Sequence, residues 1–346
     1  MSDFLPLSAE ERQWDAFVQA QGGHGLQTAA WGRLKASFGW ESEILTLEAD
    51  GEVVAGALVL YRPLPAGVGR IAYIPKGPLV DWQDAKQLEA LLMKIDQQAK
   101  RRRALFLKIE PDEANSASLR AILAQQHFRE SRQTIQPPNT ILIDLDDDDS
   151  IMSRMNQGTR RKIRSSWKKD VMVREGSRDD VATFNRLIQE TGERNEFGVH
   201  STAYYERAYD LFVPDGQAVL LMAEHQGQAL GGLMILRNQR EAWYLYGASA
   251  SIERQRMATY GLQWAAIQWA RAQGCQVYDM WGIPDTDEES LERAFQDRQD
   301  GLWGVYGFKR GFGGRVQRAV GAWDRVYFGP GYLAYQLYLS LRGQGT

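Results

Sequence analysis

Cysteine and histidine are scarce in this chain of 346 residues, which contains one cysteine and four histidines. A single cysteine, Cys275, excludes an internal disulfide and any metal site with several cysteine ligands, and it suits a reducing cytoplasm. The histidines are too scattered for the spacing of a zinc site; they are His24, His127, His200 and His225. We therefore expect no bound metal.

Long apolar runs and an excess of one charge are also missing. No stretch approaches the roughly 18 apolar residues of a membrane-spanning helix. The first residues, MSDFLP, lack the basic and apolar regions of a signal peptide. With 41 Lys and Arg against 44 Asp and Glu, the net charge is −3, so any nucleic-acid contact must come from a local basic patch. We expect a cytoplasmic protein.

The motifs of several enzyme classes are absent as well. The sequence contains no G-x-S-x-G, Walker loop, H-E-x-x-H or dinucleotide fingerprint, and hydrolysis through a covalent intermediate has no support. The composition, 44% hydrophobic and 25% charged, is that of an ordinary globular protein. The length is typical of two domains.

Two parts of the chain share one order of predicted elements. Residues 48–60 (EADGEVVAGALVL) and 224–236 (EHQGQALGGLMIL) each read as two strands joined by a tight turn. Shifting the first segment by 176 residues places Gly51 on Gly227 and Gly56 on Gly232. Each hairpin is preceded by a predicted helix and followed by a strand, a helix and a closing strand. In the first half the helix is 8–21, and the later elements are 69–75, 85–103 and 104–110. In the second half the helix is 178–193, and the later elements are 241–247, 260–273 and 276–281.

This order predicts an α/β (α+β) protein of two duplicated domains, with mixed sheets flanked by helices. We place the domains at 1–150 and 151–319, because the acidic run 144–149 meets the basic stretch 154–169 there. The aromatic, helix-like segment 320–346 is expected to pack back on the first domain.

The strongest local charge lies in residues 155–169, MNQGTRRKIRSSWKK. Arginine and lysine with an interleaved tryptophan can form a phosphate-binding surface. The candidates for such a phosphate contact, which the resemblance described below assigns to tRNA, are Arg160, Arg161, Arg164 and Lys168. The alternative is a solvated helix whose cations pair with the preceding aspartates.

Three further stretches contain candidate site residues. Residues 193–205 read as a polar loop, in which Arg194 is a better anion ligand than His200 because guanidinium groups suit phosphate and carboxylate. In residues 307–314 glycines surround Lys309, which could stabilise an oxyanion; the alternative is a basic turn. Residues 27–40 contain apolar side chains at helical spacing, which predict the buried face of a helix, and Lys35 lies beside them.

Taken together, these stretches resemble the FemABX family. The resemblance rests on Gln27, Trp31 and Lys35, on TRRKIR at 159–164, WYLYGAS at 243–249 and YGLQW at 260–264, and on Tyr278, Asp279, Gly282, Ile283, Phe308, Lys309 and GFGG at 311–314. It implies tandem domains with the fold of GCN5-related N-acetyltransferases (GNAT). It also implies transfer of an amino acid from aminoacyl-tRNA to the stem-peptide amine of a peptidoglycan precursor, linked to UDP or to lipid. Long charged helices are missing, so the chain looks like the compact FemX type, without a coiled-coil arm.

The resemblance also implies roles for single residues. Lys309 would stabilise the oxyanion, with Phe308 stacking nearby and Tyr244 opening the Y-x-Y-G motif. Lys35 and Arg194 would hold the diphosphate of the precursor, and the acceptor site would include Trp31, Glu110 and Tyr246. No cofactor is implied. We expect a monomer with aminoacyl-tRNA and the precursor as partners, and we allow for a peripheral contact with the membrane.

Two other functions remain open at this point. The first is a CoA-dependent N-acyltransferase of the same fold, although the segment RQRMATYG at 254–261 lacks the glycine pair that cradles a pyrophosphate. The second is a non-catalytic accessory protein that binds lipid or polysaccharide through its tail and its 11 tryptophans.

Overall fold

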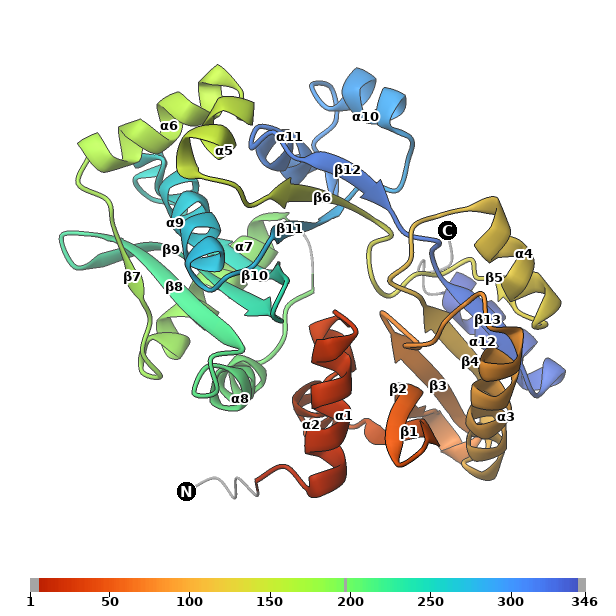
Figure 1. Ribbon diagram of the computed structural model, residues 1–346. Helices are drawn as coiled ribbons and strands as arrows, with labels where there is room; N and C mark the ends of the chain where they lie inside the picture. The colour runs from red at the N-terminus through yellow and green to blue at the C-terminus, as the bar shows by residue number, and fades with distance from the viewer. Residues whose placement is uncertain (1–5, 196–197, 342–346) are drawn as a thin grey trace. The chain divides into compact units, whose positions relative to one another are not determined.

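The computed structural model describes residues 6–195 and 198–341. Contacts divide the chain into two compact units. The first contains the residues up to Pro138 and those from Arg318 onward, and the second is Asn139–Gln317. Figure 1 shows each unit as a set of strands with helices packed on it.

The first unit is built on a sheet of six strands in the order β1-β2-β3-β4-β13-β5. Strands β3 and β4 are parallel, and the other neighbours are antiparallel. Its strands are β1 (Glu41–Ala49), β2 (Glu52–Pro63), β3 (Arg70–Pro75), β4 (Ala104–Glu110), β5 (Arg129–Glu130) and β13 (Trp323–Val326), and its helices are α1 (Ala9–Ala20), α2 (Ala29–Ala36), α3 (Ala85–Arg101), α4 (Ala117–Gln125) and α12 (Gly329–Leu341).

The second unit is built on a sheet of seven strands in the order β12-β6-β11-β10-β9-β8-β7, in which β10 and β11 are parallel. Its strands are β6 (Asn139–Asp144), β7 (Met172–Glu175), β8 (Ala218–His225), β9 (Gln228–Arg237), β10 (Glu241–Ser249), β11 (Val277–Ile283) and β12 (Arg315–Arg318). Its helices are α5 (Asp148–Arg154), α6 (Gln157–Lys168), α7 (Asp180–Asn195), α8 (Thr202–Phe212), α9 (Ala258–Ala272), α10 (Glu288–Ala294) and α11 (Trp303–Arg310).

The predicted repeat is confirmed in its local geometry. Both hairpins have two-residue turns in the left-handed region, Asp50–Gly51 and Gln226–Gly227. The aligned glycine of each second strand lies under an aromatic ring, of α1 in the first unit and of α7 in the second. A Cβ on Gly56 would come within 2.6 Å of the Trp14 ring, and one on Gly232 within 2.8 Å of the Phe184 ring. Each glycine therefore lets a helix approach its sheet closely.

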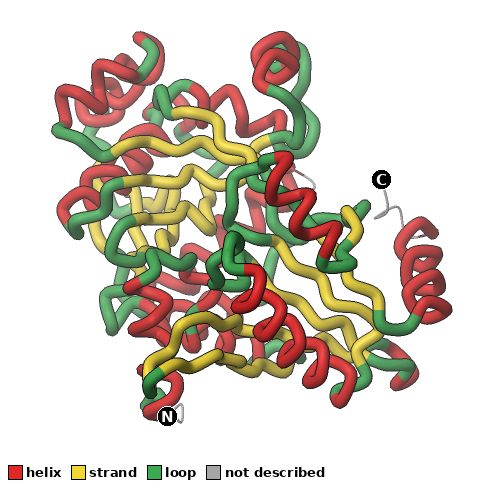
Figure 2. Tube along the Cα trace, turned by 45° about the vertical axis from the view of Figure 1, so that its right-hand side comes forward, coloured by secondary structure: helices red, strands yellow, loops and turns green. Residues whose placement is uncertain are grey.

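Helices cover both faces of each sheet, as Figure 2 shows with helices in red and strands in yellow. In the first unit, α3 and α4 pack on one face, through Leu91 and Leu123 among others. On the opposite face α12 packs through Tyr332 against Phe106. In the second unit α9 packs with β8, β9 and β11 in one core, to which Ile163 of α6 contributes.

The unit boundaries in the structure differ from those placed by sequence analysis. Strand β6 pairs with β11, so the second unit already begins at Asn139, before the acidic run. Near the C-terminus, β13 inserts between β4 and β5, and α12 then packs on β4. Sequence analysis missed β13 and β5 because their pairing partners are distant in sequence.

Candidate active site

The parallel strands β10 and β11 separate after a short paired stretch. Their register runs from Glu241 opposite Val277 to Trp243 opposite Asp279, where the pairing stops. On its other side β11 pairs with β6, and that register is interrupted between Asp279 and Gly282. Backbone groups released from a ladder need other partners, so this point can receive side chains or a ligand.

Lys309 reaches this point from helix α11. Its Nζ donates a hydrogen bond to the Gly282 carbonyl at 2.7 Å and lies 5.8 Å from the centroid of the Tyr244 ring. The side chain is buried, with 6% of the residue exposed. Burial lowers the lysine pKa to about 8, an effect that the carboxylate of Asp279 partly offsets. Lys309 is therefore a buried cation at pH 7.

The local structure around Lys309 differs from the predicted glycine turn. Residues 303–310 form helix α11, and Lys309 lies in its last turn. The helix ends close to α6, where the Asn156 amide donates to the Gly311 carbonyl at 3.1 Å. A Cβ on Gly311 would lie 2.3 Å from the Thr159 hydroxyl oxygen. The glycine is therefore required for close packing of α11 against α6.

The Y-x-Y-G motif has a steric reason in the structure. A bulge in β10 between Tyr244 and Tyr246 turns the Tyr244 ring along the strand. A Cβ on Gly247 would lie 1.7 Å from the Tyr244 hydroxyl oxygen, so only glycine leaves room for it. Burial raises the pKa of Tyr244 to about 12, and its hydroxyl is neutral at pH 7.

Asp279 is a buried carboxylate that sequence analysis did not assign to the site. Its Oδ1 accepts hydrogen bonds from the Trp281 amide at 2.6 Å and from the Thr140 hydroxyl. Trp281 has a left-handed backbone, with φ of +63°. The signal available in the sequence was a buried strand that ends in a carboxylate, a tryptophan and a glycine.

Tyr246 lies in an aromatic cluster with residues from the start of α8. Its hydroxyl is 3.0 Å from that of Tyr204, and its ring centroid is 5.3 Å from that of Tyr205. The exposed His200 ring stacks on Tyr204 at 3.7 Å. The predicted loop 193–205 is wrong in part, because α7 extends to Asn195 and α8 begins at Thr202. Glu196 and Phe197 lie outside the described residues. The cluster was missed because it forms only in the folded chain.

Two predicted site residues have structural partners. Arg194 donates to the Ser249 carbonyl and hydroxyl and to the Ser251 hydroxyl, at 2.9–3.2 Å, and so holds the end of β10. Phe308 packs against Tyr260 and Phe312. The diphosphate role of Arg194 and the catalytic role of Phe308 stay predictions.

The basic residues of α6 separate into two groups. Arg160 donates to carbonyls at the end of α5, at 2.7–3.3 Å. Among the described residues, Arg161, Arg164 and Lys168 have no hydrogen bond or ion pair to another side chain; all three are exposed at helical spacing on one face. The aspartates of 144–149 form no ion pair with Arg161, Arg164 or Lys168 in the described structure; their ion pairs there are with Arg154, Arg271 and Arg315.

A pocket of about 390 Å³ lies at the N-terminus of α9, next to α6. Its lining includes Ser249, Arg254 and Tyr260. Lys169, which directly follows α6, donates from Nζ to the Gln255 carbonyl at 2.5 Å. Lys162 donates to the Tyr260 hydroxyl at 2.9 Å. Helix α6 and the residue that follows it are therefore hydrogen-bonded to residues that line this pocket.

The predicted acceptor residues of the first unit lie along a connected set of side chains. The Lys35 Nζ is 4.9 Å from the Trp31 ring centroid. Burial and the nearby Arg62 lower the lysine pKa to about 8. The Arg62 guanidinium lies 5.4 Å from the centroid of Trp40, which in turn contacts the ring of Tyr73.

Glu110 ends this set at the last residue of β4. Its carboxylate accepts hydrogen bonds from the Tyr73 hydroxyl at 2.5 Å and from the amides of Ile135 and Gln136 at 2.5 and 3.0 Å. Burial raises its pKa, and these hydrogen bonds oppose the rise. The carboxylate fixes the segment around residue 135, and its role in substrate binding stays a prediction.

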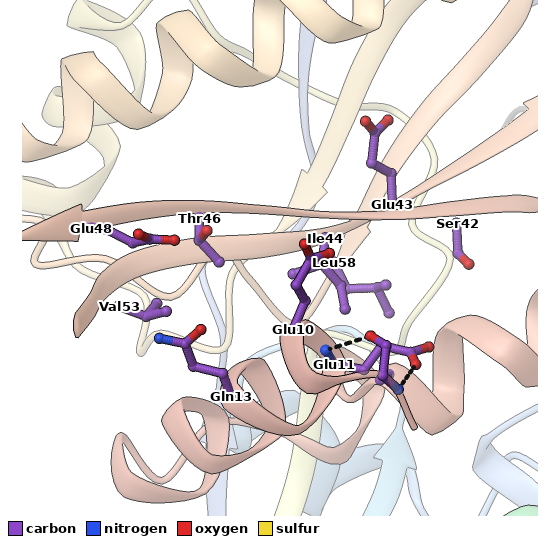
Figure 3. A pocket seen from close by; sticks show the side chains of 12 residues that line it. Glu10, Glu11, Gln13, Ser42, Glu43, Ile44, Thr46, Glu48, Val53 and Leu58 are labelled. Carbon is purple, nitrogen blue, oxygen red and sulfur yellow. Dashed lines mark hydrogen bonds between the residues drawn. The ribbon is translucent and has the colours of Figure 1, made fainter. Parts of the chain in front are cut away.

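Figure 3 shows another pocket of the first unit, between α1 and the edge strand β1. Its volume is about 570 Å³, and its lining includes Glu10, Glu11, Glu43 and Glu48. Glu11 pairs with Arg33 and Glu43 with Arg102, and Figure 3 shows Glu43 pointing away from α1. Among the described residues the lining contains no lysine or arginine, so this pocket is a poor site for a diphosphate. Among the described residues, no group of three or more His, Cys, Asp or Glu could hold a metal ion.

The fold defines the class of protein: two GNAT-like units in one chain. The structure of FemX covers 95% of this chain and 98% of its own, at a TM-score of 0.84 and 22% identity. A tandem GNAT protein from the clavulanic acid biosynthesis pathway covers 92% and 97%, at a TM-score of 0.55 and 14% identity. At these identities the likeness concerns the fold.

The chain belongs to the FemAB family, whose model matches residues 9–128, 119–229 and 223–339. Its similar relatives include the lipid II:glycine glycyltransferase of Staphylococcus saprophyticus, which is 26% identical over 94% of both chains. The protein of the same name from Staphylococcus aureus (strain USA300) is 25% identical over 93% of this chain and 92% of its own.

Proposed function

We propose that the chain is an aminoacyltransferase that moves an amino acid from aminoacyl-tRNA to the stem-peptide amine of a peptidoglycan precursor. Family membership and the names of relatives matched over nearly their full length support this class of reaction. The use of tRNA as donor is what the resemblance to the FemABX family implies, and the exposed cations of α6 support it.

The buried cation Lys309 at the separation of β10 and β11 carries the proposal. In the reaction the acceptor amine attacks the ester carbonyl that joins the amino acid to the tRNA ribose. A C–N bond forms, the C–O bond to the ribose breaks, and the ribose oxygen leaves with a proton lost by the amine. Between these steps the carbonyl oxygen carries negative charge, which Lys309 stabilises while the neutral Tyr244 hydroxyl offers a donor.

The exposed face of α6 supplies the contact to tRNA. Arg161, Arg164 and Lys168 present three cations on one helix face. The pocket at the start of α9 adjoins this helix, and we assign the terminal base of the acceptor end to it. The cationic face gives affinity, and the pocket orients the terminal nucleotide.

Lys35 is the proposed ligand of the acceptor diphosphate, and Arg194 is a separate candidate for a phosphate contact. Lys35 lies beside Arg62, and this positive neighbourhood favours an anion. Trp31, Glu110 and Tyr246 complete the proposed acceptor residues. Arg194 must exchange some of its bonds to Ser249 and Ser251 to contact a phosphate.

The main alternative is a CoA-dependent N-acyltransferase. A CoA pyrophosphate would bind at the start of α9, where Met257 is the N-cap residue. Met257 has a left-handed backbone, with φ of +59°, and its side chain does not cap the helix. In addition, no glycine pair brings backbone amides close to the ligand. These features favour the aminoacyl-tRNA donor over CoA.

Isothermal titration separates the two functions. We expect binding of UDP-linked muramyl pentapeptide and no saturable binding of acetyl-CoA under the same conditions. Saturable binding of acetyl-CoA together with no binding of the muramyl peptide would overturn the proposal. A parallel titration with lipid-linked precursor in detergent identifies the preferred acceptor.

A further inference from the structure

Helix α12 has an apolar face with no protein partner in the described structure. Leu333, Leu337 and Leu341 recur every four residues on this face and are 68%, 61% and 80% exposed. Phe328, directly before the helix, is 53% exposed. Single exposed leucines are common, but a row of them beside an exposed phenylalanine marks a binding surface.

The opposite face of α12 is anchored to the sheet. Tyr332 is buried against Phe106, and its hydroxyl donates to Asp324 at 2.9 Å. Leu339 is also buried. The helix contains no charged residue from Gly329 to Leu341, so it is largely apolar although only one face is covered. Figure 2 shows it as the helix beside the C label.

Cationic side chains lie near the N-terminal end of α12. The Phe328 amide donates to the Leu105 carbonyl at 2.9 Å, which places Phe328 beside the end of the basic run 100–103. The exposed Arg101 and Arg103 of this run have no side-chain partner among the described residues. The guanidinium of Arg129 lies 4.6 Å from the centroid of Tyr332.

The acidic groups near this surface are already paired. Asp324 is buried in an ion pair with Lys108, and Asp96 pairs with Arg325. Glu130 pairs with Arg120. The surface therefore combines apolar side chains with arginines that no acid of the described structure neutralises.

We propose that α12 and its arginine rim bind the surface of an anionic lipid membrane. The leucines and Phe328 would enter the boundary between headgroups and acyl chains, while the guanidinium groups contact lipid phosphates. No helix of the described residues is long and apolar enough to cross a bilayer. With 13 residues, α12 instead has the length to lie in the membrane plane.

Charge distinguishes lipid from a second copy of the chain. A two-fold contact through α12 would bring the same arginines of both copies together, and like charges at an interface are unfavourable. Anionic headgroups match the rim instead. This inference goes beyond the proposed function, because binding to the membrane requires neither donor nor acceptor.

Flotation of the full chain with vesicles tests the proposal. We expect binding to vesicles of phosphatidylcholine with phosphatidylglycerol and much weaker binding to phosphatidylcholine alone. The variant L333Q/L337Q should weaken partitioning about tenfold or more because it removes two apolar anchors. The variant R101Q/R103Q should weaken it by about fivefold for each cation removed. The control M93Q/M172Q replaces two equally exposed methionines outside α12 and should bind as the wild type does.

Thermal unfolding verifies that the variants are folded, as expected for substitutions at exposed positions. Absence of wild-type binding to the anionic vesicles, or equal binding by L333Q/L337Q, would overturn the proposal. So would concentration-dependent dimerisation that L333Q/L337Q abolishes, if neither protein binds vesicles. Because L333Q/L337Q should still transfer to a UDP-linked soluble acceptor, failure of membrane binding is distinguishable from failure of the proposed function.

Discussion

At the scale of single residues, the proposed chemistry depends on Lys309. Its amine is buried, hydrogen-bonded to the Gly282 carbonyl and close to the face of Tyr244. A preorganised donor at a developing oxyanion contributes about a hundredfold or more to turnover. We therefore expect Lys309→Ala to lower the single-turnover rate by about a hundredfold or more, with little change in acceptor affinity.

The neighbouring Arg310 provides the matched control. Its guanidinium pairs with Glu292 and not with a group at the point where β10 and β11 separate. Arg310→Ala should therefore retain most of the activity. A Lys309→Ala protein that loses acceptor affinity but keeps its single-turnover rate would show that Lys309 binds substrate instead.

The pKa of Lys309, lowered by burial to about 8, predicts the pH dependence of turnover. The charged form is present below this pKa and is lost as the pH rises through it, so kcat should fall above about pH 8. Lys309→Arg should remove this fall, since arginine stays protonated. Lys35 also has a pKa of about 8, but its assigned role is acceptor binding, and its titration should change KM. A kcat profile that falls identically in Lys309→Arg would contradict the assignment.

At the scale of elements, a buried ion pair joins β4, β13 and α12. The Lys108 Nζ is 2.8 Å from Asp324 and also donates to the Gln133 carbonyl at 2.9 Å. Asp324 accepts in addition from Tyr332 of α12. Removing one member of such a pair leaves a buried, uncompensated charge, at a cost of about 3–5 kcal/mol.

We expect Lys108→Met to lower the free energy of unfolding of the chain by about this amount in urea titrations. The double variant Lys108→Met/Asp324→Leu should recover much of the loss, since both charges are then absent. A double variant no more stable than the single one would show that the hydrogen bonds to the 131–133 segment and to Tyr332 matter more than the charge.

Helix α6 offers a second test at this scale. If its free face contacts tRNA, the logarithm of affinity falls linearly with the logarithm of salt concentration. Replacing Arg161, Arg164 and Lys168 with alanine should reduce the slope by about 0.7–0.9 for each tRNA phosphate that the helix no longer neutralises. Arg160 is left intact because it caps α5. The exposed Arg293 of α10 serves as control. An unchanged slope in the folded triple variant would make α6 a solvated helix.

At the scale of the whole molecule, the sequence was informative where structure is local. The tight turn at Asp50–Gly51, the helix within 8–21 and the relative order of the elements shared by both halves were predicted, because each depends on residues close in the chain. Strands β13 and β5 were not, because they form only through pairing with distant segments.

In the candidate site, too, residues in local motifs were predicted, and features that depend on the fold were not. The motif residues Lys309 and Tyr244 were identified from sequence, and the structure brings them together. The helix under Lys309 was missed, because the glycines at 307 and 311 suggested a turn although Gly311 is required for close packing. Tyr204 and Tyr205 gain their neighbours only in the fold, so no local pattern marks them. Asp279 lies in a motif of the resemblance, but its hydrogen bonds with Trp281 and Thr140 form only in the fold.

The proposed activity of the whole molecule is transfer of an amino acid from tRNA to a peptidoglycan precursor. Incubation of the full chain with tRNA charged with labelled glycine and with UDP- or lipid-linked muramyl pentapeptide tests it directly. We expect the label to move to the muramyl peptide, and ribonuclease treatment of the donor to abolish the transfer. Acetyl transfer from acetyl-CoA to the precursor, with no transfer from glycyl-tRNA or from a mixture of other charged tRNAs, would contradict the claim.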